Sequence, residues 1–325
     1  MRIARLYNTC MSLIEYQRTI LADPIRNRAF SDALKKLIIP GKTTVADIGA
    51  GTGYLSFLAR KLGAKECHLY EVSELSDISR ALAKETSITG CHFIHKHSTE
   101  VKNPPKVDLV ISETFGNFAL EESIIGNLND AKRFLKPGGN IMPMNLKQFI
   151  APVITDRIQK SIDTWSGIEG NFQWNAAREV AMNNMYVKDI RPEDFLKDGT
   201  KEWDHIDFTK HNKEIRHASL QWNADQIANH QSPIVNGFAL WWSSDLAAGI
   251  TLSTSPFEKP THWQQIYLPL LETVSLKANE TLELTLDVDS RYDVRINVAW
   301  KTTVKDKQGK IVKAISQDMR RGFLS

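Results

Sequence analysis

Two hydrophobic periods alternate along the first half of the chain. Short apolar runs with strand character, such as Thr44–Ile48, are followed by segments with the spacing of an amphipathic helix, such as Tyr54–Leu62. Further strands are expected at His68–Val72, His92–His95, Val107–Ser112 and Asn140–Met142, and further helices at Leu75–Lys84 and Glu122–Lys136, the last ending at Pro137-Gly138-Gly139. Strands that alternate with helices predict an α/β domain with a parallel sheet.

The pattern changes after about Pro143, where short alternating runs are separated by turns rich in Asn, Asp, Gly and Pro. The expected strands are Ile234–Trp242, Gly249–Thr254, Gln265–Pro269, Thr281–Asp287 and Val294–Thr302. This half is therefore expected to be an all-β sandwich or barrel. Trp165–Leu196 interrupts it with a polar, helical-looking stretch that carries scattered Trp, Phe and Met, which suggests an insertion or a partner-binding arm.

Composition narrows the function classes. The chain has 325 residues and a formal net charge of +3, so we expect no broad basic face for nucleic acid. No stretch approaches the roughly 18 apolar residues that cross a bilayer, so we expect no membrane contact. The three cysteines show neither ligand spacing nor a disulfide framework. A soluble, cytoplasmic protein without a metal is the expectation.

A glycine-rich turn follows the first strand, with the sequence Asp47-Ile48-Gly49-Ala50-Gly51-Thr52-Gly53. Glycines there let the backbone approach a ligand closely. The dinucleotide pattern G-x-G-x-x-G fails, because its third glycine falls on Tyr54 or Ser56. D-x-G-x-G-x-G is instead the pattern of class I methyltransferases, whose donor is S-adenosyl-L-methionine. Asp47 could attract the donor's ammonium group and Glu71 could accept its ribose hydroxyls, unless both acids merely cap strands.

Two acids nine residues apart, Glu113 and Glu122, flank a mostly apolar loop after the fourth expected strand. Ligands of such sheets lie at the carboxyl ends of the strands, where Glu113 is expected. Two carboxylates brought together there repel each other unless a cation lies between them.

These motifs resemble those of the protein arginine methyltransferases. The segment from Glu113 to Glu122 looks like that family's double-E loop, and Thr261-His262-Trp263 looks like its THW loop. Asp23-Pro24-Ile25-Arg26 resembles its N-terminal D-x-x-R helix, and Glu71-Val72-Ser73 resembles its ribose-binding turn. The four motifs span most of the chain in the family's order.

The resemblance implies a domain plan and a set of roles. It implies N-terminal helices over the cofactor (1–35), a Rossmann-like cofactor domain (36–145) and a β-barrel substrate domain (146–325). It implies that Glu113 and Glu122 bind a guanidinium group in catalysis, that Asp23 orients His262, and that Trp263 helps to bind substrate. Glu122 or His262 would accept the proton. The residues implied to bind S-adenosyl-L-methionine are Arg26 at its carboxylate, Asp47, Gly49, Gly51, Gly53, Glu71, and Thr99 with Glu100 near the adenine.

Several positions depart from the family pattern. Asn8, Met11, Gln17, Ile20, Asn117 and Ile124 stand where the family usually has other residues. They surround the donor and the acceptor but leave both acids intact. The expected acceptor is therefore arginine in a protein or peptide, with a small arginine-like or natural-product substrate as the alternative. A catalytically inactive protein that only binds the donor is the alternative from another class.

The helical arm, at about 160–198, lies where the family places its dimerisation arm. Aromatic residues and Met are enriched at protein interfaces. We therefore expect a homodimer through this arm, with packing of the same residues against the chain's own β domain as the alternative.

Overall fold

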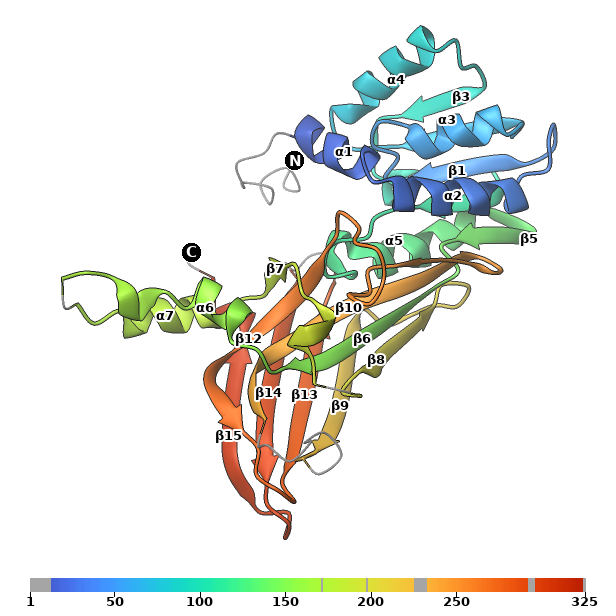
Figure 1. The fold of residues 1–325 in the computed structure, drawn as a ribbon. Coiled ribbons are helices and arrows are strands. Elements are labelled where there is room, and N and C mark those ends of the chain that lie inside the picture. The colour runs from blue at the N-terminus through green and yellow to red at the C-terminus, as the bar shows by residue number, and fades with distance from the viewer. Residues whose placement is uncertain (1–12, 171, 197, 225–232, 292–295, 324–325) are drawn as a thin grey trace.

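The structure is a computed structural model that describes residues 13–170, 172–196, 198–224, 233–291 and 296–323. Asn8, Met11 and the start of the strand expected at Val294–Thr302 lie outside the described residues. Helices and a parallel sheet form one half of the molecule, and antiparallel sheets form the other (Figure 1). The expected mixed architecture is therefore confirmed.

Five parallel strands form the first sheet in the order β3-β2-β1-β4-β5. They are β1 (Thr44–Ile48), β2 (Glu66–Tyr70), β3 (Cys91–Ile94), β4 (Val107–Ser112) and β5 (Leu135–Met142). The accompanying helices are α1 (Leu13–Leu21), α2 (Pro24–Leu37), α3 (Tyr54–Lys61), α4 (Leu75–Glu85) and α5 (Ile124–Ala131). The strand order reverses between β1 and β4. In sheets of this kind, ligands bind beside that point at the carboxyl ends of the strands.

The helix expected over Glu122–Lys136 is wrong at both ends. Glu122 and Ser123 have φ of 53° and 55°, so α5 begins only at Ile124. It ends at Ala131, and β5 already begins at Leu135. Pro137-Gly138-Gly139 thus lies inside a strand. It is tolerated there because β5 is an edge strand whose pairing with β4 shifts from Leu135 to Asn140, so that Pro137 lies in the irregular stretch between them.

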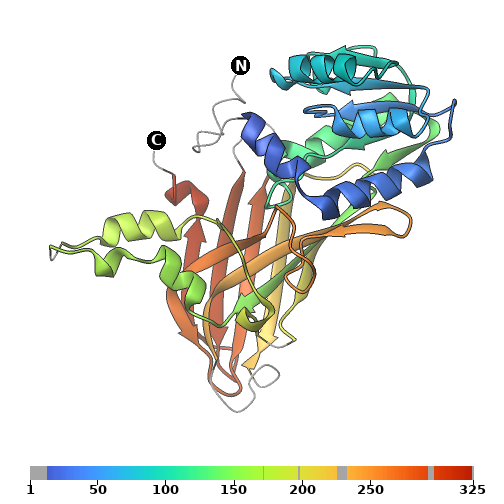
Figure 2. The same ribbon diagram turned by 45° about the horizontal axis from the view of Figure 1, so that its top comes forward.

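The second half contains two antiparallel sheets. One has the order β7-β12-β10-β6-β8, with β11 paired to β10, and the other has the order β15-β14-β13-β9. The strands are β6 (Asn145–Val153), β7 (Tyr186–Lys188), β8 (Lys201–Asp207), β9 (Ile215–Asn223), β10 (Ile234–Ala247), β11 (Ile250–Ser253), β12 (Gln265–Ser275), β13 (Thr281–Asp289), β14 (Asn297–Lys305) and β15 (Ile311–Asp318). Together they form the expected barrel-like domain (Figure 2).

The segment Trp165–Leu196 is less helical than expected. Its described α-helix is α7 (Asn175–Met182), and α6 (Arg157–Ile162) precedes the segment. Tyr186–Lys188 instead forms β7, which pairs with Gln265–Tyr267 at the end of the six-stranded sheet. Backbone pairing across the sheet overrides the local helical pattern here. Figures 1 and 2 show α6 and α7 projecting from the barrel.

One hydrophobic core continues from the parallel sheet into the barrel. It includes Phe115 and Phe118 of the loop after β4 together with Trp203, Trp242 and Trp263 of the second half. The two halves are thus held together at the edge where the sheet's ligands are expected. None of the described helices is both long and apolar enough to cross a membrane.

Candidate active site

The glycine turn after β1 has a backbone that suits glycine alone. Gly49, Gly51 and Gly53 have φ of +73°, +55° and +83°, a region that residues with a Cβ seldom adopt. A Cβ on Gly49 would lie 2.8 Å from Thr114 Cγ2, and one on Gly53 would lie 2.7 Å from Phe57 Cζ. The turn, called the glycine cradle below, is therefore tightly packed and lies at the carboxyl ends of β1 and β4.

Glu71 fastens the next loop to this cradle. Its Oε2 accepts a hydrogen bond from Gly51 N and its Oε1 accepts one from Ser73 N, both at 2.8 Å. Helix α1 lies over the glycine turn. Gln17 Oε1 of this helix lies 3.1 Å from the position that a Cβ on Gly51 would take. The departure from the family pattern at Gln17 therefore lies directly on the cofactor turn.

Asp47 supports the turn from inside. Its side chain is buried, and its Oδ2 accepts a hydrogen bond from Ser56 Oγ at 2.7 Å. Burial raises the pKa of Asp47 to about 6 despite that hydrogen bond. The carboxyl group thus bonds to a residue of α3, and its expected contact with an ammonium group stays a prediction.

Thr99 and Glu100 lie on an exposed 3₁₀ turn, Ser98–Glu100, that follows β3. Thr99 Oγ1 lies 2.7 Å from Nδ1 of His97, which caps this turn. Their expected contact with the adenine stays a prediction.

Glu113 follows the last residue of β4 and is held by Arg26 of α2. Arg26 Nε donates to Glu113 Oε2 at 3.0 Å, and a second guanidinium nitrogen forms an ion pair with the same oxygen. The two side chains are only 5% and 9% exposed. Arg26 therefore neutralises an acid that water could not stabilise at this depth.

Glu122 lies nine residues further on, in the 3₁₀ turn Glu121–Ser123 before α5. Its carbonyl accepts a hydrogen bond from Asn127 Nδ2 at 2.9 Å, which holds the unusual backbone, and the residue is exposed. Both acids act on one neighbour: burial, and then the negative charges of Glu122 and Glu113, raise the pKa of Tyr16. The structure thus places both acids within electrostatic range of one side chain on α1.

Tyr16 is a candidate site residue that the sequence did not reveal. It lies on α1 among otherwise ordinary helix residues, and nothing in its local pattern distinguishes it. Burial and the neighbouring acids raise the pKa of its hydroxyl further above the ordinary value of 10, so the hydroxyl is a hydrogen-bond donor at neutral pH. Only the folding of α1 over the loop after β4 gives it a role.

We predict that Tyr16→Phe lowers kcat/KM for methyl transfer by roughly tenfold to a hundredfold, the effect expected when a hydroxyl that donates to Glu113 or Glu122 in the loaded enzyme is lost, at about 1.5–3 kcal/mol for a hydrogen bond to a charged group. Steady-state kinetics together with the melting temperature measure this. Tyr186→Phe is the matched control, because it removes a tyrosine hydroxyl that donates to Ala181 O on the barrel side of the molecule. An unchanged kcat/KM for Tyr16→Phe would remove Tyr16 from the site.

The expected pairing of Asp23 with His262 is present. Asp23 Oδ2 accepts hydrogen bonds from the backbone N and from Nδ1 of His262, both at 2.9 Å. Its Oδ1 caps α2 by accepting from Ile25 N and Arg26 N. His262 Nε2 is buried and has no hydrogen-bond partner among the described residues. One carboxylate therefore orients both the His262 ring and the helix that carries Arg26.

We predict an acid-sensitive contribution from Asp23. Burial opposes its ionisation, but hydrogen bonds from His262 and Arg26 outweigh this and lower its pKa to about 2. A lowered carboxyl pKa stabilises the fold at pH values above the group's usual pKa of 3.8. That stabilisation disappears as the pH falls from about 4 to 2. Asp23→Asn should cost about 1–2 kcal/mol at pH 7, measured by urea unfolding, and this cost should shrink only as the pH falls below about 4. An equal loss at pH 7 and pH 2.5 would contradict this assignment.

Trp263 supports the loop after β4, which connects Glu113 with Glu122. Its indole is 1% exposed, and Nε1 donates to Phe115 O at 2.8 Å. Its own carbonyl accepts a hydrogen bond from Asn117 Nδ2. The side chain is thus placed as a support for the loop, and its expected contact with substrate stays a prediction.

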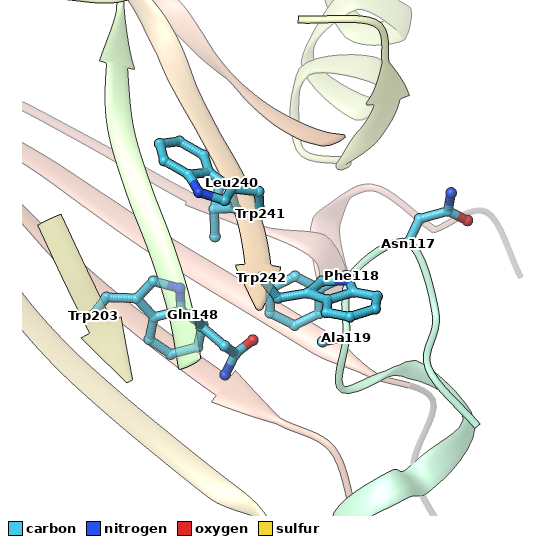
Figure 3. A pocket seen from close by; sticks show the side chains of 8 residues that line it. All are labelled: Asn117, Phe118, Ala119, Gln148, Trp203, Leu240, Trp241 and Trp242. Atoms are coloured by element: carbon cyan, nitrogen blue, oxygen red, sulfur yellow. The ribbon is translucent and has the colours of Figure 1, made fainter. Parts of the chain in front are cut away.

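The rear of this loop packs tightly against the barrel. Figure 3 shows the contact, with side chains from the loop facing strands β6, β8 and β10, while Asn117 points away from the aromatic residues. The space between them is too narrow for a water molecule. Phe118 stacks on Trp203 with ring centroids 6.2 Å apart, and Phe115 stacks on Trp242 at 4.5 Å. The barrel thus fixes the loop that carries Glu113 and Glu122.

Comparisons with known proteins agree with this geometry. Residues 147–305 match the family model described as the arginine methyltransferase oligomerization subdomain. The protein arginine N-methyltransferase 6 of Xenopus tropicalis is 32% identical over 298 residues, which cover 87% of this chain and 85% of the relative. The chain belongs to the protein arginine N-methyltransferase family. The enzyme of the same name from Xenopus laevis is 28% identical and covers 88% of both chains.

Solved structures of protein arginine methyltransferases share the fold. The Arabidopsis thaliana protein arginine methyltransferase 10 superposes with a TM-score of 0.76 at 21% identity, over 94% of this chain and 98% of that one. The Trypanosoma brucei PRMT1 enzyme–prozyme heterotetrameric complex with AdoHcy gives a TM-score of 0.77 at 21% identity, over 93% and 96%. The arginine methyltransferase fold thus extends over nearly the whole chain.

Proposed function

We propose that this chain transfers a methyl group from S-adenosyl-L-methionine to a guanidino nitrogen of arginine in a protein or peptide. The observation that carries the proposal is that Glu113 follows β4, beside the point where the strand order reverses, while the loop that leads from it to Glu122 is hydrogen-bonded to Trp263 of the barrel. The relatives named above are arginine N-methyltransferases, which supports the same activity.

The cradle fits S-adenosyl-L-methionine. Its backbone leaves no room for a Cβ at Gly49 or Gly53, and Glu71 stands where a carboxylate can accept ribose hydroxyls. Arg26, at the start of α2, is paired with Glu113 in this structure and would hold the donor's carboxylate by turning its guanidinium towards the cradle. When bound, the donor supplies a methyl group activated by a sulfonium cation.

The two acids offset the repulsion between two cations, the guanidinium of the acceptor and the sulfonium of the donor. A guanidinium placed beside a sulfonium costs Coulomb energy, and a water-poor site enlarges that cost. Glu113 and Glu122 offset the repulsion and hold the planar guanidinium by paired hydrogen bonds. A guanidino nitrogen held in this way would face the methyl group that the donor supplies, in line with the bond from that methyl group to sulfur. The proton that leaves the nitrogen goes to Glu122 or His262.

A labelled-donor assay tests the proposal directly. The chain is incubated with methyl-labelled S-adenosyl-L-methionine and either an arginine-containing peptide library, the same library with lysine at each arginine position, or free arginine derivatives. Label should enter the arginine library and be recovered as methylarginine after hydrolysis. Label only in the free derivatives would favour the small-molecule alternative, and no label despite donor binding would favour the inactive one.

We also propose that the chain forms a homodimer through the arm at about 160–198. Its support is the family model of an oligomerization subdomain, together with apolar side chains presented to solvent near α7. Phe172 is 68% exposed, and its ring meets the indole of Trp174 edge-on, with ring centroids 6.2 Å apart. Exposed aromatic pairs of this kind are typical of interface residues.

We also propose a cytoplasmic location. The free thiols of Cys67 and Cys91 support it, because a reducing compartment keeps thiols free.

We predict that Phe172→Glu converts the dimer to a monomer, because it places a charge in the apolar centre of the interface. Light scattering at micromolar concentration measures the mass. Ile311→Glu, which changes an exposed apolar residue at the start of β15 outside the arm, is the control and should leave the mass unchanged. A wild-type chain that is strictly monomeric would contradict the proposed homodimer.

A further inference from the structure

A polar cluster lies on the outer part of the parallel sheet, outside the proposed active site. Glu66 and His68 belong to β2, and His92 belongs to the edge strand β3. The parallel register places His68 directly beside His92. Neighbouring registered residues share a face of a sheet, and so do residues two apart on one strand. All three side chains therefore lie on one face.

The three side chains already converge. One potential ligand atom from each lies within 4.8 Å of those of the other two. His92 Nε2 is 3.1 Å from Glu66 Oε2, and the rings of His68 and His92 stack with centroids 4.6 Å apart. Glu66 and His68 are half-buried and His92 is exposed, so water and ions reach the cluster. Shifts of about 1 Å would bring all three atoms to the 2.0–2.2 Å typical of zinc ligands.

We propose that Glu66, His68 and His92 bind a divalent transition-metal ion of the zinc class. Two imidazoles and one carboxylate are a set that Zn²⁺ accepts with water as the fourth ligand, whereas Mg²⁺ and Ca²⁺ prefer oxygen alone. The negative carboxylate also offsets part of the charge of the ion.

Such an ion would clamp a weak edge of the sheet. β3 has only four residues and pairs with β2 alone. The cluster lies at the start and middle of β2, whereas Glu71 follows the end of that strand. Bound metal should therefore stabilise the fold by linkage without taking part in methyl transfer. The sequence offers no motif for this site, because His68 and His92 meet only through strand pairing.

Spectroscopic titration tests the site. The chain, freed of metal by a chelator, is titrated with Co²⁺ in a non-chelating buffer while the visible d–d absorption is followed. A single saturating band that Zn²⁺ abolishes is expected. His92→Ala and Glu66→Gln should each weaken Co²⁺ binding by about tenfold or more, since each removes one of three ligands.

His217→Ala is the matched control, because His217 is an exposed histidine whose Nδ1 also contacts a carboxylate, Asp287 Oδ1, at 2.7 Å. It should leave the titration unchanged. Zn²⁺ should also raise the melting temperature of the wild type and of His217→Ala but not of His92→Ala. The proposal is overturned if the wild type gives no saturable band, or if His217→Ala loses as much affinity as His92→Ala.

Discussion

Glu122→Gln should lower kcat by at least about a thousandfold while donor affinity changes less than about threefold. The amide keeps the shape of the side chain but removes the negative charge that offsets the guanidinium beside the sulfonium, and it removes one acceptor for the leaving proton. The proposed donor site is the glycine cradle with Glu71, which this substitution leaves intact. Single-turnover kinetics and isothermal titration with S-adenosylhomocysteine separate the two effects.

Glu85→Gln, the same charge change on the exposed end of α4, is the control and should leave both quantities unchanged. If Glu122→Gln retained full activity, the two-acid mechanism would be wrong. If donor binding fell together with activity, Glu122 would instead belong to the cofactor site.

Arg26→Met should lower the free energy of unfolding by about 3–5 kcal/mol at neutral pH, because it leaves the Glu113 carboxylate buried without its partner. Urea unfolding followed by circular dichroism measures the loss. Adding Glu113→Gln to Arg26→Met should recover most of it, since the second change removes the uncompensated charge. Methyl transfer should remain absent in the double variant.

The control for this pair is Lys136→Met, which breaks the half-exposed ion pair with Asp108 and should cost less than about 1 kcal/mol. A loss for Arg26→Met no larger than that for Lys136→Met would show that the contact between Arg26 and Glu113 contributes nothing beyond a surface pair.

Much of the cofactor half could be predicted from the sequence because its signals are local. The fully buried strand Thr44–Ile48 was predicted with its observed ends, and the glycine turn after it has the positive φ angles that only glycine adopts readily. The pairing of Asp23 with His262, which joins residues far apart in the chain, was implied only by the family resemblance.

What the sequence missed depends on contacts between distant segments. The strain at Glu122 and Ser123 follows from how the loop after β4 is held against the barrel, so α5 begins later than its apolar spacing suggests. β7 forms because β12 offers a partner. Tyr16 joins the acids only once α1 lies over the loop.

The most direct test of the central claim is a crystal structure of this chain with S-adenosylhomocysteine and an arginine peptide. The account predicts that the carboxylates of Glu113 and Glu122 both lie within hydrogen-bond distance of one guanidinium group, with a guanidino nitrogen facing the donor's sulfur. A guanidinium bound by only one of the two acids, or lying away from that sulfur, would contradict it.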